Sequence, residues 1–183
     1  MKRTMDVVFS LTALLLLSPL LLLVALAVAR DGGPALFVQR RVGLGGREFG
    51  MYKFRSMVPD ASALGSYQTV SGDARITPVG RFIRRTSIDE LPQLINVLRG
   101  QMSLVGPRPD VPAQRELYLP ADWAVRCSVR PGLTGWAQAL LRSEATAQQR
   151  LELDLRYARE HSLWLDLKIM AWTISRLSGK GSN

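Results

Sequence analysis

The sequence predicts an α+β protein that is mainly helical and carries a membrane segment at its N-terminus. Three observations predict this class. An apolar run opens the chain, a glycine-rich turn separates two short strand-like segments, and helix-start prolines and apolar periodicity mark much of the remainder. With 183 residues, of which 47% are hydrophobic, the chain suffices for one compact domain and one membrane segment.

Residues 7–29 form one uncharged apolar run, longer than the ~20 residues with which a helix crosses the hydrocarbon core. A secretory signal peptide is the alternative, because Lys2 and Arg3 precede the run and Ala27-Val28-Ala29 resembles a cleavage site. The apolar part of such peptides usually covers only ~7–15 residues. We therefore expect the segment to stay in or on a membrane.

Ser18 and Pro19 interrupt the apolar run near its centre. Proline removes a helical donor and clashes with the preceding turn, and the serine hydroxyl can satisfy a backbone group that this frees. Two arms result, residues 7–17 and 20–29, and each reaches ~15 Å, about half the hydrocarbon thickness. A hairpin that enters and leaves by the same face is therefore possible.

Basic residues flank both ends of the run, and cytoplasmic flanks attract Lys and Arg. These residues are Lys2, Arg3, Arg30, Arg40 and Arg41. The flanks favour a cytoplasmic hairpin, but a kinked helix that spans the membrane remains an equal alternative on spacing and charge.

The chain divides into a membrane segment, residues 1–30, and one further domain, residues 31–183, because no repeat or long linker separates two domains after the apolar run. Residues 36–39 and 49–54 are predicted strands of a short β-hairpin that turns at the glycine-rich residues 43–46.

Helical signals dominate from Pro78 onward. Pro78 and Pro92 each open a short helix, whereas the polar residues 61–74 before them and residues 106–109 after them are expected to be a loop and a turn. Residues 148–177 are helix-rich, and an apolar stripe runs through their last part, formed by Leu163, Leu167, Met170, Ile174 and Leu177. Trp164 and Trp172 suit a membrane interface; packing on the domain's own core is the alternative.

Charge and composition exclude several classes of protein. The chain has 24 Lys and Arg against 15 Asp and Glu, so its partner is expected to be anionic: a nucleic acid, an anionic phospholipid membrane or a phosphorylated substrate. No aromatic RNA-binding motif supports nucleic acid, so we expect none. Cys127 has no second cysteine to pair with, and together with the lone His161 it disfavours a zinc site, which leaves an oxygen-ligated Mg²⁺ as the expected metal.

The common nucleotide-binding loops are also absent. Residues 43–48 lack the third glycine of a dinucleotide fingerprint, and residues 45–50 precede Met51-Tyr52 where a Walker loop needs Lys-Ser or Lys-Thr. No Gly-x-Ser-x-Gly elbow is present either.

Adjacent acids, Asp89 and Glu90, lie between clustered arginines and a helix start. Ser87-x-x-Glu90 also matches a capping box, but that helix would carry Pro92 in its interior. Starting the helix at Pro92 places both acids just ahead of its N-terminus, where free N–H groups favour an ionised carboxylate. The arginines suit phosphate oxygens, with a solvated basic face as the alternative, and are Arg81, Arg84, Arg85, Arg99 and Arg108.

Further motifs occur in a fixed order along nearly the whole chain. They are Lys2-Arg3 with Asp6, Ser18-Pro19, Phe37-x-Gln39-x-Arg41-x-Gly43, Lys53-Phe54-Arg55-Ser56-Met57, Thr77-Pro78-x-Gly80-Arg81, Asp89-Glu90-Leu91-Pro92-Gln93-x-x-Asn96-Val97, the segment from Met102 to Pro109, the segment from Arg130 to Gln138, and Ser162 to Lys168. This order resembles the bacterial sugar transferase family, the monotopic phosphoglycosyl transferases that act on polyprenyl phosphate. Larger relatives add an N-terminal multi-span region, so the chain is expected to be the minimal catalytic form.

The resemblance implies a monotopic protein with a re-entrant broken helix and amphipathic interfacial helices, located at the cytoplasmic face of the bacterial inner membrane. It also implies a two-step reaction that starts glycoconjugate or exopolysaccharide synthesis. Asp89 would attack the β-phosphorus of a UDP-sugar, expel UMP and hold the phosphosugar until polyprenyl (undecaprenyl) phosphate accepts it. Asp89 would also bind Mg²⁺, and Glu90 would act as acid, base or metal neighbour.

By the same resemblance, Lys53, Arg55, Arg84 and Arg108 would bind the substrate's phosphates, and Pro109 belongs to the turn that would seat the nucleotide. One departure affects the sugar contacts: relatives commonly continue Val-Asn-Gly-Arg-Asn after Gln138, whereas this chain has Ala139-Leu140-Leu141-Arg142-Ser143. Arg142 is retained as a candidate substrate contact. Ser56 replaces a common threonine and keeps the hydroxyl.

Two other functions compete with the transferase. A basic, membrane-anchored interaction protein would explain the charge but would have no use for adjacent acids inside an arginine cluster. A nucleotide-sugar hydrolase would use the same intermediate and give it to water. The sequence indicates neither the sugar, nor the pathway, nor the oligomeric state.

Overall fold

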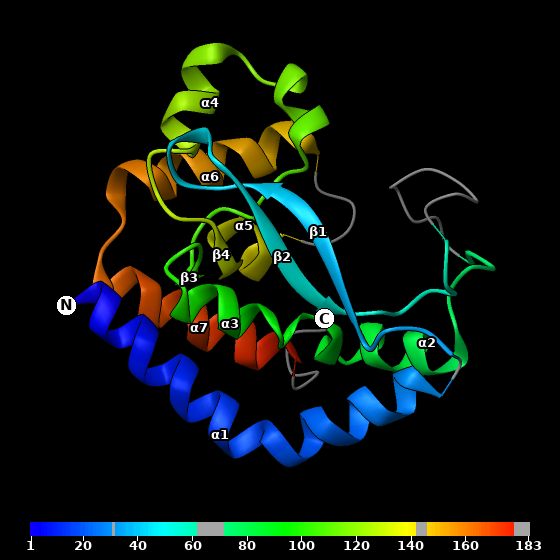
Figure 1. Ribbon diagram of the computed structural model, residues 1–183. Helices are drawn as coiled ribbons and strands as arrows, with labels where there is room; N and C mark the ends of the chain where they lie inside the picture. The colour runs from blue at the N-terminus through cyan, green and yellow to red at the C-terminus, as the bar shows by residue number, and fades with distance from the viewer. Residues whose placement is uncertain (31, 62–71, 142–145, 178–183) are drawn as a thin grey trace.

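The computed structural model of the chain describes residues 1–30, 32–61, 72–141 and 146–177 (Figure 1). Its elements follow the order α1 (Lys2–Ala29), β1 (Leu36–Val42), η1 (Leu44–Gly46), β2 (Glu48–Phe54), α2 (Pro78–Arg85), η2 (Ile88–Glu90), α3 (Gln93–Leu98), β3 (Ser103–Val105), η3 (Pro112–Leu117), α4 (Pro120–Arg126), β4 (Gly132–Thr134), α5 (Trp136–Leu140), α6 (Ala147–Glu160) and α7 (Leu163–Leu177). The mainly helical class and the short hairpin are confirmed.

Helix α1 is long and apolar enough to cross a membrane, and it bends midway along its length (Figure 1). Pro19 lies inside the helix and has no N–H for the carbonyl of Leu15, four residues back. The Ser18 hydroxyl donates to that same carbonyl at 2.8 Å, so the bend leaves the Leu15 oxygen satisfied.

The N-terminal end of α1 is fixed to the domain by three charged side chains. The Lys2 ammonium forms an ion pair with the fully buried Asp166 carboxylate of α7 at 2.6 Å. Arg3 donates to the carbonyls of Val97 and Leu98 at the C-terminus of α3. One turn further along, Asp6 is 2% exposed. Its carboxylate accepts hydrogen bonds from β3.

The C-terminal end of α1 packs on the same domain. Val24 and Val28 form an apolar cluster with Phe54 at the end of β2 and Ile83 of α2. The buried guanidinium of Arg55 donates to the Val28 carbonyl at 2.9 Å, so a polar contact fixes this end as well. Both ends of the apolar helix thus contact one domain.

The hairpin pairs β1 with β2 in antiparallel register, and both strands are longer than predicted. The edge of β2 that faces away from β1 is fixed by the buried Asn96 of α3. The Asn96 amide accepts from the Tyr52 N–H at 3.0 Å and donates to the Gly50 carbonyl at 2.7 Å. This pairing holds β2 along α3, which brings the strand's last residues beside the acid pair.

A second, parallel pair of strands, β3 and β4, was not predicted, because each has only three residues. Three glycines allow the backbones to meet at this point. A Cβ atom on Gly106 would lie 2.3 Å from the Arg130 carbonyl oxygen, and one on Gly135 would lie 2.2 Å from that of Gly106. Gly132 is equally confined. This crossing fixes the start of the turn that carries Arg108.

The helix at Pro78 is confirmed: Thr77 caps it by accepting from the Gly80 N–H at 2.9 Å. The next helix begins at Gln93, with Pro92 as its N-cap. Of the predicted loop at residues 61–74, residues 62–71 lie outside the described part of the chain.

The helix-rich C-terminal part consists of α6 and α7. Asp166 and Ile169 bury one face of α7 in the core, whereas Trp164, Leu167 and Ile174 lie exposed on the other. The packing of this helix on the domain's core is therefore confirmed for one face, and the interfacial location of its outward apolar face stays a prediction.

We expect Asp6→Ala to destabilise the protein, because it leaves the buried Ser103 hydroxyl and Leu104 N–H without their acceptor. The loss should be on the order of 3 kcal/mol in the free energy of unfolding, measured by denaturant unfolding in detergent. Replacing the exposed Glu116 by Ala is the matched control and should change stability little. An Asp6→Ala variant as stable as the wild type would contradict this account of the anchor.

Candidate active site

Asp89 and Glu90 lie in the short 3₁₀ turn η2, between α2 and α3. Ser87 precedes the turn with a left-handed backbone, φ 57°, which reverses the chain after α2. Its side chain makes no capping bond, so the capping-box alternative is wrong. Non-glycine residues adopt this conformation at a cost, and such strain is common at functional sites.

Glu90 connects two cations from distant parts of the chain. Its Oε1 accepts from Lys53 Nζ of β2 at 2.8 Å and from Arg108 Nη2 of the 106–109 turn at 2.7 Å. The side chains of Lys53 and Glu90 are mostly buried, whereas that of Arg108 is half exposed. The predicted residues Lys53, Glu90 and Arg108 are thus brought together, and Arg108 is left accessible to a ligand.

The two acids have opposite pKa shifts. Burial opposes ionisation of Glu90, but attraction to Arg108 and Lys53 outweighs it and lowers the Glu90 pKa to about 2. Burial raises the pKa of the 7%-exposed Asp89, and the neighbouring Glu90 charge adds to this effect. The expectation that a helix start alone favours an ionised Asp89 is therefore incomplete. Burial and the Glu90 charge oppose ionisation of Asp89, whereas the charges of Lys53, Arg84 and Arg108 favour it.

The arginine cluster splits between different surroundings. Arg84, at the end of α2, attracts the Asp89 charge and belongs to the site. Arg81 and Arg85 lie exposed on α2. Arg99 donates to the Tyr52 hydroxyl and lies over that ring. Only part of the predicted cationic cluster therefore faces the acids.

The Arg55 side chain binds backbone carbonyls instead of facing the acids. Its guanidinium donates to the carbonyls of Val28, Pro34 and Met57, so it holds the chain after α1. Its predicted role in substrate binding stays a prediction, as do the roles of the other site residues. Arg142 lies outside the described residues.

A cleft of about 780 Å³ adjoins the acid pair through Arg108 and Pro109, which both line it. Arg41 of β1 also lines it and donates to the Pro109 carbonyl at 2.9 Å. Burial, together with repulsion from Arg108, lowers the Arg41 pKa to about 10. The cleft is thus cationic where it meets the acids.

A buried ionic network, missed in the sequence, supports the Arg108 turn. Arg126 of α4 pairs with Asp110 at 2.5 Å and with Asp154 at 3.0 Å, and it donates to the Arg108 carbonyl at 2.5 Å. These residues are far apart in the sequence and belong to no recognisable spacing.

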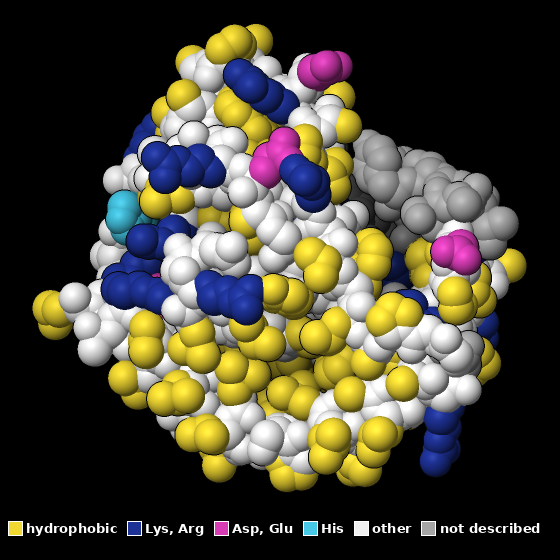
Figure 2. All heavy atoms as spheres, in the orientation of Figure 1, with side chains coloured by type: hydrophobic (Ala, Val, Ile, Leu, Met, Phe, Trp, Pro, Cys, Tyr) yellow, Lys and Arg dark blue, Asp and Glu magenta, His cyan; other side chains and the backbone are white. Residues whose placement is uncertain are grey.

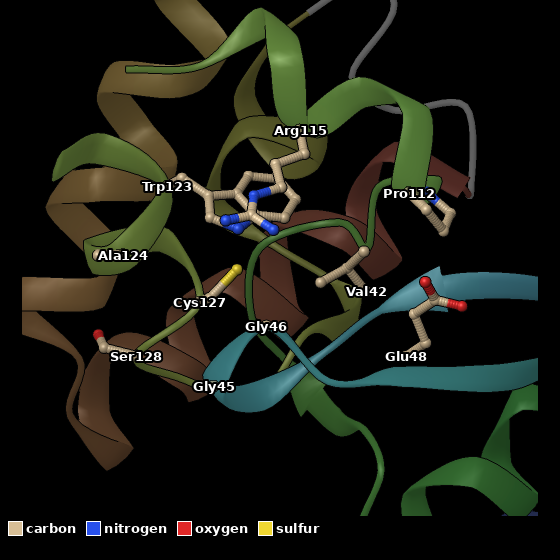
Figure 3. A pocket seen from close by; sticks show the side chains of 10 residues that line it. All are labelled: Val42, Gly45, Gly46, Glu48, Pro112, Arg115, Trp123, Ala124, Cys127 and Ser128. Atoms are coloured by element: carbon tan, nitrogen blue, oxygen red, sulfur yellow. The ribbon is translucent and has the colours of Figure 1, made fainter. Parts of the chain in front are cut away.

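A second cavity, of about 500 Å³, lies between the hairpin turn and α4 (Figure 3). None of the predicted site residues lines it in the described part of the chain. Its lining includes Cys127, and burial raises the pKa of that thiol, which makes it a poor nucleophile. This cavity is therefore not a candidate for the same chemistry.

Asp89 and Glu90 fit Mg²⁺ only in one mode. The residues that the structure describes include no group of three or more acidic, histidine or cysteine side chains that could form a complete metal cage. Mg²⁺ is commonly bound by one or two carboxylates plus substrate phosphates, and adjacent carboxylates match that mode.

Arg176 of α7 is a further cation of the cleft. It lines the cleft and donates to the carbonyls of Gln138 and Leu141 at 2.5 and 2.6 Å. It therefore caps the C-terminal end of α5.

The amino-acid sequence is similar to those of known proteins. Residues 1–180 match the family model of the bacterial sugar transferases. The chain is 50% identical to the undecaprenyl-phosphate glucose phosphotransferase of Komagataeibacter xylinus, over 96% of this chain and 35% of that protein. It is 47% identical to the UDP-glucose:undecaprenyl-phosphate glucose-1-phosphate transferase of Caulobacter vibrioides, over 96% of this chain and 69% of that one.

A third relative acts on another sugar. The chain is 42% identical to the UDP-N-acetylgalactosamine-undecaprenyl-phosphate N-acetylgalactosaminephosphotransferase of Aeromonas hydrophila, over 99% of this chain and 44% of that protein. The chain thus spans less than half the length of two of these three relatives.

We expect Glu90→Gln to destabilise the protein in a pH-dependent way. The Glu90 pKa is depressed to about 2, below the ~4.3 of an unfolded glutamate, so its ion pairs stabilise the fold above pH ~4.3. That contribution is lost as the pH falls toward 2. Unfolding of wild type and variant in detergent should therefore differ most near pH 7 and converge toward pH 2–3. A difference that grew on acidification would contradict the pairing, and Glu116→Gln is the exposed control.

Proposed function

The chain belongs to the bacterial sugar transferase family, and from this premise we propose that it transfers a sugar 1-phosphate from a UDP-sugar to polyprenyl phosphate. The observation that carries the proposal is the buried Asp89 beside Glu90, whose carboxylate pairs with Lys53 and Arg108. An interaction protein would need no such arrangement.

In the proposed first step, an Asp89 carboxylate oxygen bonds to the β-phosphorus. The bond from that phosphorus to the bridging oxygen breaks, and UMP leaves with this oxygen. In the second step, an oxygen of polyprenyl phosphate bonds to the phosphorus and the bond to Asp89 breaks. The products are polyprenyl diphosphate sugar and a free carboxylate. Dividing one transfer in this way is typical of carboxylate nucleophiles.

Burial suits Asp89 to this role, because a carboxylate without a full water shell reacts more readily once it is ionised. The nearby Lys53, Arg84 and Arg108 favour that ionised form and would neutralise phosphate charge. Glu90 stays ionised at neutral pH, so it is unsuited to donate a proton. We assign it to hold Lys53 and Arg108 in place.

Mg²⁺ is part of the proposal. Asp89 would hold it together with the substrate's phosphates, where it would supply charge neutralisation.

We also propose that the chain is monotopic, with residues 1–30 re-entering the cytoplasmic face of the bacterial inner membrane. Support comes from the two ends of α1, because Lys2, Asp6 and Val28 all contact one domain. A straight spanning helix would separate those ends by the membrane. Hydrophobic side chains gather over the bent helix at the bottom of Figure 2, with Lys and Arg side chains above them, as a helix half-embedded in lipid would require.

Incubating the chain with a UDP-sugar and Mg²⁺, without polyprenyl phosphate, should give a protein heavier by one phosphosugar and an equal amount of UMP. Intact-protein mass spectrometry and UMP quantitation measure both. Asp89→Asn should abolish the adduct, since an amide is neither a competent nucleophile nor a good Mg²⁺ ligand. Glu90→Gln retains the attacking group, so some adduct should form.

The same experiment separates the alternatives. An adduct mapped by peptide mass spectrometry to Glu90 would reverse the two roles, and turnover without any adduct would replace the covalent route by direct transfer. UMP that accumulates catalytically without polyprenyl phosphate would identify a hydrolase. No UMP with or without the acceptor would favour the interaction protein.

Membrane topology provides a separate prediction. Cysteines at Thr4 and Arg30, both exposed, should react with a membrane-impermeant maleimide only after spheroplasts are opened. Replacing Ser18 and Pro19 by Leu removes a proline cost of ~3 kcal/mol in a helix interior, so some molecules should expose Thr4→Cys outside. Leu22→Ala/Leu23→Ala, which keeps the bend, is the control. External labelling of Thr4→Cys without these changes would rule out the re-entrant arrangement.

A further inference from the structure

The cleft beside the acid pair contains a polar side chain without a partner. Gln138, in α5, lines this cleft. Both polar atoms of its amide, Oε1 and Nε2, are buried and lack a hydrogen-bond partner among the described residues. A buried amide group without partners is costly, so a group that pairs with both atoms would gain more than an ordinary hydrogen bond gives.

The amide lies against the backbone at Gly135. A Cβ atom there would lie 2.7 Å from Gln138 Oε1, and the Gly106 carbonyl oxygen, 2.2 Å from the same Cβ position, is what requires glycine. Arg176 donates to the Gln138 carbonyl at 2.5 Å, which fixes the backbone of the residue while its side chain remains unpaired. The backbone of Gln138 is therefore fixed, and its side-chain amide is available to pair with another molecule.

The cleft adjoins the acid pair at Arg108. This residue lines the cleft, and its side chain donates to Glu90 at 2.7 Å. Its backbone is held by Arg126, which donates to the Arg108 carbonyl at 2.5 Å. A phosphate bound at Arg108 would thus lie between the acids on one side and the cleft on the other.

The rest of the lining suits a nucleoside. The cleft measures about 780 Å³, within the range of small-molecule sites. Tyr118 supplies an aromatic ring, which packs against Trp123 and the Arg126 guanidinium, and Arg41 adds positive charge beside Arg108. An aromatic ring contacts the face of a base, an amide pairs with the edge of the base, and cations bind the phosphate.

We propose that this cleft holds the nucleoside monophosphate part of the donor and that the Gln138 amide pairs with the edge of its base. The inference rests on the proposed function, in which the donor is a UDP-sugar. After a turn about its terminal torsions, the Gln138 amide accepts from the uracil N3–H through Oε1 and donates to the adjacent uracil carbonyl through Nε2. Asp89 then faces the sugar-bearing phosphate beyond Arg108.

The test measures binding of UMP and of ribose 5-phosphate, which lacks the base, to the full chain in lipid nanodiscs by calorimetry. Gln138→Leu should weaken UMP binding roughly tenfold to hundredfold and leave ribose 5-phosphate unchanged, because only the base contacts are lost. Gln148→Leu, on exposed α6, is the matched control and should bind UMP as the wild type does. Arg108→Ala should weaken both ligands.

A second ligand tests the base contact directly. The 3-methyl derivative of UMP lacks the N3–H that the Gln138 amide oxygen would accept. It should bind the wild type more weakly than UMP does, whereas Gln138→Leu should bind the two ligands alike. A merely structural role for Gln138 would leave the ratio of the two affinities the same in wild type and variant.

Unchanged UMP affinity in Gln138→Leu, or equal affinities of the wild type for UMP and its 3-methyl derivative, would overturn the proposal. The binding measurements need no turnover, so they separate this inference from the proposed function. Gln138-dependent UMP binding without transfer to polyprenyl phosphate would leave the base site standing and reject the transferase. Transfer to polyprenyl phosphate, combined with UMP binding that does not depend on Gln138, would reject the base site and leave the transferase standing.

Discussion

The buried anchor at the N-terminal end of α1 is the constraint on which the remaining arrangement depends. Asp6 is held by β3, Lys2 by Asp166 of α7, and Arg3 by the end of α3. Buried charges persist only where partners compensate their lost hydration, and these partners come from three separate elements. Helix α1 is therefore part of the domain's core structure, and the bend at Pro19 lets its other end return to the same domain.

The acid pair shows how one short turn gives two neighbouring carboxylates different properties. Glu90 is tied to Lys53 and Arg108 and stays charged, while burial disfavours the charge on Asp89. Because the same cations attract both acids, Glu90 takes the direct hydrogen bonds and Asp89 is left with the longer-range attraction. This division supports a structural task for Glu90 and a reactive one for Asp89.

Much of the local structure could be predicted from the sequence, because it depends on nearby residues. The bend at Ser18-Pro19, the hairpin, and the helix capped by Thr77 all follow from short-range rules. The contacts of Asp6, Asn96 and Arg126 could not be derived in the same way. Each joins elements separated by tens of residues, and no periodicity encodes such pairs. The local pattern of acids and arginines singled out Asp89 and Arg108, and the family resemblance supplied their roles, whereas the unpaired amide of Gln138 became visible only in three dimensions.

Helix α3 has a consequence for how the chain can change over evolutionary time. Its six residues connect the acid pair at one end with carbonyls bound by Arg3 at the other, and Asn96 between them pairs with β2. Adding or deleting one residue would rotate everything beyond it by about 100°. Side-chain substitution cannot absorb such a rotation. This segment is therefore closed to insertions and deletions, and length variation among homologous chains is expected in surface connections instead.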